Sequence, residues 1–306
     1  MKKIITSCLA MAALAVGVAT TLAQQQRVTT TKQKVGQRIE TRGQASSRLA
    51  SLHPSVAFAV TQPEKSAVTS VVVPGANTMF GGLMVYSDKW QTSESTPGVV
   101  SIQAREGGAI SMVHSNKDML NVKSAVKVNN IVYATAMNLS TYKIYVQEYS
   151  ATSWTCTRNE ETDMVNLASS LACDPTTGKI YGSFFNTETE YWDRFCSYSA
   201  SLGEATDIAN MNRDVHALAF NSEGELYGIW GATGWLVKID KKTGSYVQVG
   251  KTGLNPISVD DYGVNSLAFG NDGALYWSAT YQGVNSKDMR GGLFKIDTAT
   301  GKATKV

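Results

Sequence analysis

Short apolar runs separated by polar, glycine-containing turns dominate the C-terminal half of the chain. The segment 266–277, SLAFGNDGALYW, has this pattern, and 217–228, ALAFNSEGELYG, is a degenerate copy of it. Runs of about four to eight residues rich in Val, Ile, Tyr and Phe, bounded by turn residues, predict β-strands. We therefore expect pairs of antiparallel strands joined by tight turns.

This strand pattern recurs at a nearly constant interval. The tyrosines of the second strand in successive units are Tyr86, Tyr133, Tyr181, Tyr227 and Tyr276, which lie 47, 48, 46 and 49 residues apart. Four short strands per repeat of about 40 to 50 residues are typical of a β-propeller blade. The sequence predicts an all-β fold, a β-propeller of about five four-stranded blades, which is either a complete ring or the front part of a larger one.

The repeats also predict where each blade begins and ends. The propeller is expected over 55–306, with the segment 55–60 as an extra strand that joins the first blade to the last. The five blades are expected at about 69–118, 119–164, 165–211, 212–259 and 260–306.

Glycines recur at the two turns of each of the last two units. Gly224 and Gly273 occupy the turn between strands one and two, and Gly244 and Gly301 the turn between strands three and four. Glycine is favoured where a turn requires a positive φ. The third unit has Gly178 and Gly203 in looser versions of the same turns. We interpret these turns as structural.

The N-terminal residues indicate export. Lys2 and Lys3 precede an apolar run that ends in small residues, which is typical of a signal peptide over 1–23. Residues 24–54 follow as a polar, basic linker, with six Lys or Arg and one Glu up to residue 50. We expect the mature protein in the periplasm, on the outer surface or outside the cell, without a membrane span.

The last two units carry a family resemblance. SLAFGNDGALYW followed by GGLFKIDTATGKATKV resembles the blade repeat of secreted bacterial propellers of the YVTN, NHL and quinoprotein-like group. The resemblance covers units four and five, most of unit three, and only the strand rhythm of units one and two. The signal peptide and the Ser/Thr-rich mature chain also resemble exported proteins of the Bacteroides group. The resemblance implies the fold rather than one activity.

Charge and cysteine content remove several classes of function. The formal net charge is +3, so nothing in the overall charge favours nucleic acid as a partner. Cys156, Cys173 and Cys196 show no CxxC spacing and are expected to be small core residues. No G-x-S-x-G, P-loop or H-E-x-x-H motif occurs.

The topology of a propeller blade divides the disc into two faces. Both glycine turns fall on one face, the turn face; the loops between strands two and three and the links between blades fall on the other, the loop face. Variable loops on a rigid scaffold commonly bind ligands. Aromatic and amide side chains suited to a sugar ring or a protein partner occur there: Tyr191, Trp192, Trp235, Tyr262, Tyr281 and Asn285.

Catalytic residues are few. Asp214 and Asp261 precede the first strands of the last two units, and His216 is expected to face the central channel. We therefore expect a non-catalytic, exported binding module for a glycan or a protein of the cell envelope, without a cofactor. Two alternatives stay open. One is a lactonase, lyase or glycosidase type of propeller enzyme, with a carboxylate, histidine or Ca²⁺ site at the channel mouth; the other is a truncated larger propeller.

Overall fold

The structure is a computed structural model. It describes residues 78–86, 96–103, 110–115, 120–138, 141–231, 233–257, 265–283 and 289–306. The predicted signal peptide at 1–23, the linker at 24–54 and the extra strand at 55–60 lie outside these residues.

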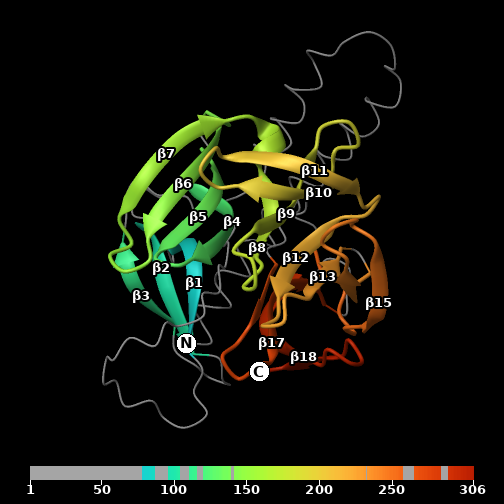
Figure 1. The fold of residues 1–306 in the computed structure, drawn as a ribbon. Helices are drawn as coiled ribbons and strands as arrows, with labels where there is room; N and C mark the ends of the chain where they lie inside the picture. The colour runs from blue at the N-terminus through green and yellow to red at the C-terminus, as the bar shows by residue number, and fades with distance from the viewer. Residues whose placement is uncertain are drawn as a thin grey trace.

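The described strands form five antiparallel sheets, which succeed one another in chain order. Figure 1 shows the chain passing from one sheet to the next around a ring, with the colour advancing from cyan at β1 to red at β18. The first sheet consists of β1 (Thr78–Tyr86), β2 (Thr96–Gln103) and β3 (Ile110–Ser115).

Four further sheets have four strands each. Blade 2 consists of β4 (Asn121–Val128), β5 (Ile131–Met137), β6 (Ile144–Ser150) and β7 (Cys156–Thr162). Blade 3 follows the short 3-10 helix η1 (Met164–Asn166) and consists of β8 (Ala168–Cys173), β9 (Ile180–Asn186), β10 (Tyr191–Ser199) and β11 (Glu204–Asn210).

Blades 4 and 5 come from the best-conforming repeats of the sequence. Blade 4 consists of β12 (Val215–Phe220), β13 (Leu226–Trp230), β14 (Trp235–Ile239) and β15 (Tyr246–Lys251). Blade 5 consists of β16 (Ser266–Phe269), β17 (Leu275–Gln282), β18 (Met289–Ile296) and β19 (Ala303–Lys305).

The first strands of the blades lie at the centre. β4, β8, β12 and β16 contact one another in that order, and β1 contacts β4. This arrangement is a β-propeller with the first strand of each blade innermost, as the sequence predicts. Four four-stranded blades are confirmed. The first unit contributes a three-stranded sheet among the described residues, so a fifth four-stranded blade stays a prediction.

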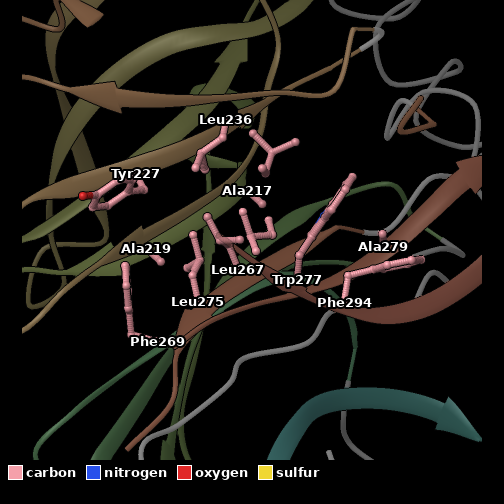
Figure 2. Packing of buried hydrophobic residues seen from close by; sticks show 12 residues of the cluster. Ala217, Ala219, Tyr227, Leu236, Leu267, Phe269, Leu275, Trp277, Ala279 and Phe294 are labelled. Carbon is pink, nitrogen blue, oxygen red and sulfur yellow. The ribbon is translucent and has the colours of Figure 1, made fainter. Parts of the chain in front are cut away.

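The hydrophobic core lies between the blades. Between blades 4 and 5, Leu267, Leu275 and Trp277 of blade 5 pack against Ala217 and Tyr227 of blade 4, as Figure 2 shows. Burying one large apolar side chain contributes roughly 1.5–3 kcal/mol. The repeated segment 266–277 therefore forms the first strand and the start of the second strand of blade 5 and packs against blade 4.

The predicted glycine turns have the predicted backbone. Positive φ values occur at Gly178, Gly203, Gly224, Gly244, Gly273 and Gly301. At some of these positions a side chain is also excluded by lack of space, because the turn lies against the preceding blade. A Cβ at Gly301 would lie 2.4 Å from the carbonyl oxygen of Gly250 in blade 4, and one at Gly244 would lie 2.5 Å from Ala209 Cβ in blade 3.

Polar contacts also fasten blades together at these turns. Lys241 Nζ in blade 4 lies 2.5 Å from Oδ2 of the buried Asp174 in blade 3 and 3.1 Å from the carbonyl oxygen of Gly224. Burial alone would raise the pKa of Asp174, but hydrogen bonds from Lys241, Thr176 and Thr177 hold it well below its usual range. The turn face is thus assembled by residues of the repeat itself.

Candidate functional site

Two equivalent hairpins present exposed tyrosines on the loop face. The loop between β5 and β6 carries Tyr142, which is 39% exposed, and β10 begins at Tyr191, which is 54% exposed. In both hairpins an asparagine precedes the turn: Thr141 N–H donates to Asn138 Oδ1, and Glu188 N–H donates to Asn186 Oδ1. Such Asx contacts fix the turn conformation.

The backbones of the two turns close in the same way. Tyr142 N–H donates to the Asn138 carbonyl at 2.7 Å, and Glu190 N–H donates to the Asn186 carbonyl at 2.8 Å. Tyr142 and Glu190 both have positive φ, at 58° and 60°. Since the loops between the second and third strands of all blades lie on one face of a propeller, adjacent blades offer two tyrosines on similarly shaped supports.

The hairpin of blade 3 is held by a buried carboxylate. Asp193 accepts hydrogen bonds from Asn186 Nδ2 at 2.9 Å and from the Thr189 hydroxyl at 3.3 Å. Its backbone carbonyl accepts the N–H of Met211 in the link to blade 4. The hairpin, its own strand and the next blade are therefore tied at one point, which fixes the direction in which Tyr191 projects.

A second carboxylate, that of Asp214, holds the backbone of the same hairpin at Trp192. Asp214, proposed from the sequence as a weak catalytic candidate, is half-buried and accepts the backbone N–H of Trp192 at 2.8 Å. Burial raises the pKa of Asp214, the Trp192 N–H lowers it, and the neighbouring Asp193 carboxylate raises it. The only partner that the structure gives Asp214 among the described residues is backbone, which indicates a supporting role.

Trp192 differs from its predicted place on the loop surface. Its indole is 0% exposed and packs edge-on against Phe185, with 5.2 Å between the ring centroids. The surrounding cluster joins blades 2 and 3 and contains Met137, Ile144, Met164, Leu167, Phe185 and Trp192. The pairing of β10 with β9 is irregular between Tyr191 and Arg194, and there Tyr191 is exposed whereas Trp192 and Asp193 are both buried. Trp192 is a core residue, and no ligand on the loop face could reach its ring.

The other predicted aromatic side chains are half-buried or not described. Trp235 lies at the start of β14 with Lys251 Nζ 5.6 Å from its ring centroid, and Tyr281 packs edge-on against Phe294 at 5.5 Å. These two residues belong to blades 4 and 5, and no contact between either of them and Tyr191 is found among the described residues. Tyr262, Asn285 and Asp261 lie outside the described residues.

His216 also departs from expectation. It was predicted to face the channel, but it is 1% exposed and lies against Gly231, where an added Cβ would be 2.2 Å from His216 Nε2. Within the described part of the chain, neither ring nitrogen has a hydrogen-bond partner. Burial lowers the pKa of His216 to about 4, so the ring is neutral at pH 7. The structure does not link it to Asp214, and no acid–base pair forms there.

Tyr142 is not among the binding residues predicted from the sequence. The sequence signal is an asparagine followed by a tyrosine, four residues later at Tyr142 and five residues later at Tyr191, so Tyr142 has the backbone position of Glu190 and Tyr191 comes one residue after it. Blade 2 lacks the glycine turns, so its loops were harder to align with those of blade 3. Only the shared backbone hydrogen bonds make the two hairpins comparable.

Other features narrow the possible chemistry of the described residues. Cys156, Cys173 and Cys196 are free thiols, and of these only Cys196 is fully buried. Nowhere in the described ranges do three or more His, Cys, Asp or Glu side chains gather as a metal site would require. In the same ranges, no helix has the length and apolar character needed to cross a membrane.

Comparison with known proteins gives remote structural likenesses. No protein-family model matches the chain, and no curated protein matches it. Among solved structures, a protein of unknown function from Bacteroides thetaiotaomicron is similar with a TM-score of 0.46 and 15% identity, covering 82% of this chain and 58% of that one. The chain thus spans little more than half the length of that protein.

Two enzymes are also similar at this level. Virginiamycin B lyase from Staphylococcus aureus has a TM-score of 0.41 and 11% identity, covering 83% of this chain and 70% of the lyase. The periplasmic gluconolactonase from Pseudomonas aeruginosa has a TM-score of 0.40 and 10% identity, covering 76% and 82%. The propeller fold of the present chain rests on its own sheet topology.

Proposed function

We propose that the chain is an exported, non-catalytic propeller module that holds a glycan or a protein of the cell envelope on its loop face. The observation that carries this proposal is the pair of exposed tyrosines, Tyr142 and Tyr191, on equivalent hairpins of adjacent blades. Tyrosine offers a flat apolar face and a hydroxyl at low entropic cost, which suits both sugar rings and protein hot spots.

The rigidity of the supports favours binding. Hydrogen bonds from Asn186 and Thr189 to Asp193, and from Trp192 N–H to Asp214, orient the blade 3 hairpin before any partner arrives. Preorganised side chains lose less entropy on association. The same hydrogen bonds occupy Asp214, and the buried His216 is neutral, so these residues support a binding role rather than proton transfer. The proposed binding requires no cofactor.

The test is binding of the purified protein to isolated cell-envelope material. We expect Tyr142→Ala with Tyr191→Ala to reduce binding at least tenfold, because two anchoring side chains are removed while the backbone hydrogen bonds of both hairpins remain. Leu202→Ala is the matched control, since Leu202 is 66% exposed in the turn between β10 and β11, on the turn face.

Treatment of the envelope identifies the class of partner. Loss of binding after periodate oxidation indicates a glycan, and loss after protease digestion indicates a protein. Equal binding by the wild type, the double variant and Leu202→Ala would refute the proposed site.

A further inference from the structure

A polar position recurs at the loop-face end of every described inner strand of blades 2 to 5. In blades 2, 3 and 4 the pairing of the first two strands is interrupted by a β-bulge, whose extra residue is Lys123, Ser169 or His216. Asn265, directly before β16, has the corresponding place in blade 5. All four residues are buried. Bulges redirect side chains and are frequent beside functional sites.

Three of these four residues line a cavity on the propeller axis. The cavity has a volume of about 410 Å³ and is bounded by β4, β8, β12 and β16, with Lys123, Ser169 and Asn265 in its lining. Small-molecule sites commonly measure about 300–1,000 Å³. Its lining is polar where the inner strands begin, and aromatic where β12 and β16 end at Phe220 and Phe269.

The serines in the lining are held in place and keep hydrogen-bonding capacity. Ser170 Oγ accepts the N–H of Leu218 from the next blade at 2.8 Å, which leaves its own hydroxyl proton to donate. Ser169 Oγ lies 3.1 Å from the Val215 carbonyl oxygen and 3.2 Å from that of Ser183. Its proton is used there, and its lone pairs can accept.

Two further groups extend this set. Asn265 accepts the Trp277 indole N–H at 3.1 Å and donates to the Ile257 carbonyl at 3.1 Å, so its amide retains one proton and one lone pair. The hydroxyl of the buried Ser124 has no hydrogen bond within the described residues. Asp174 also borders the cavity, but its carboxylate is occupied by Lys241, Thr176 and Thr177.

We propose that this axial cavity binds a small polyhydroxylated molecule of sugar size. Serine hydroxyls and an amide offer donors and acceptors side by side, and a ligand hydroxyl is likewise both donor and acceptor. The C–H surfaces of such a ligand would face Phe220, Phe269 and the neighbouring leucines. Because Tyr142 and Tyr191 are not in the lining, this site is independent of the proposed function.

Titration of the full chain with single sugars and polyols tests the proposal. The probes are glucose, galactose, mannose, N-acetylglucosamine and sorbitol, followed by calorimetry and by ligand-observed NMR. Ser124→Ala removes one hydroxyl without breaking a described hydrogen bond and is expected to weaken binding about tenfold. Ala268→Leu fills part of the cavity and is expected to abolish binding, because Ala268 is in the lining.

Matched controls separate the cavity from the surface. Ser222→Ala and Ala299→Leu make the same chemical changes at exposed turn positions and are expected to bind like the wild type. Tyr191→Ala is also expected to retain sugar binding, whatever its effect on envelope binding. The proposal is overturned if none of the five probes binds the wild type, or if Ser124→Ala and Ala268→Leu bind as tightly as their controls.

Discussion

The two faces of the propeller are built from different kinds of sequence. On the turn face, some of the repeated glycines lie directly against the preceding blade, as Gly301 does against Gly250 and Gly244 against Ala209, and Lys241 of blade 4 forms an ion pair with Asp174 of blade 3. On the loop face, contacts are particular to one place, as in the Trp192 cluster and the Asp193 hydrogen bonds. Repeated residues therefore assemble the ring, and residues that do not repeat shape the surface available for binding.

The largest expected effect separates neighbouring residues of the loop face. Trp192→Ala should lower the free energy of unfolding by about 3–5 kcal/mol, because it leaves a large cavity between blades 2 and 3. Tyr191→Ala should change it by less than about 0.5 kcal/mol, since that side chain is exposed. Urea unfolding measures both, and similar values for the two variants would contradict the assignment of Trp192 to the core.

The bulge residues of blades 3 and 4, Ser169 and His216, differ in their hydrogen bonding. Between blades 3 and 4, the Ser169 hydroxyl donates to the Val215 carbonyl, whereas the ring nitrogens of His216, at the same bulge position in blade 4, have no hydrogen-bond partner among the described residues. Burial lowers the pKa of His216 in the folded state to about 4, below the 6.5 of a solvent-exposed histidine. The unfolded state therefore binds the proton first as the pH falls, and stability is lost from about pH 6.5 down to pH 4.

This loss amounts to about 3 kcal/mol attributable to His216. His216→Asn places at this position the residue that blade 5 already has there, Asn265, and removes the titrating group. We expect the difference in unfolding free energy between wild type and variant to shrink or change sign in the variant's favour as the pH falls from 7 to 4. A difference independent of pH would show that the imidazole is hydrated or paired in solution.

The smallest expected effect concerns the turn face. Gly301→Ala should lower the free energy of unfolding by about 2 kcal/mol, because φ is 78° and the new Cβ would lie 2.4 Å from the Gly250 carbonyl oxygen. Gly178→Ala, with φ of 70° and no atom within 4 Å of the added Cβ, should cost about 1 kcal/mol from the backbone alone. Thermal unfolding of the two variants compares them directly. Equal losses of unfolding free energy in the two variants would contradict the steric contribution, since they would mean that the backbone at Gly250 moves away from the new Cβ without cost.

Much of the fold was readable because its signals are local. The strand at 266–269, the turn at Gly273 and the strand at 275–282 follow from apolar runs and one glycine. The candidate site was less readable. Tyr191 was correctly expected to be exposed, but Trp192 was not expected to be buried, because residue type does not reveal which side of a strand meets the adjacent blade.

His216 illustrates the same difficulty in another form. A polar residue at the start of an inner strand was reasonably expected at the channel, and Ser169 and Asn265 at that position do line the cavity. In blade 4 the residue at this bulge, His216, has its imidazole against Gly231 instead. A bulge depends on how two strands pair, which the sequence of either strand alone does not specify.

The repeat, the strands of the last blades and the turns follow from the sequence alone, because apolar alternation and the φ requirement of glycine act over a few residues. The burial of Trp192 between two blades, the similar hairpins that carry Tyr142 and Tyr191, and the convergence of Lys123, Ser169 and Asn265 on one cavity are visible only in the tertiary structure. These relations join residues tens of positions apart, and they arise from the packing of whole blades against one another.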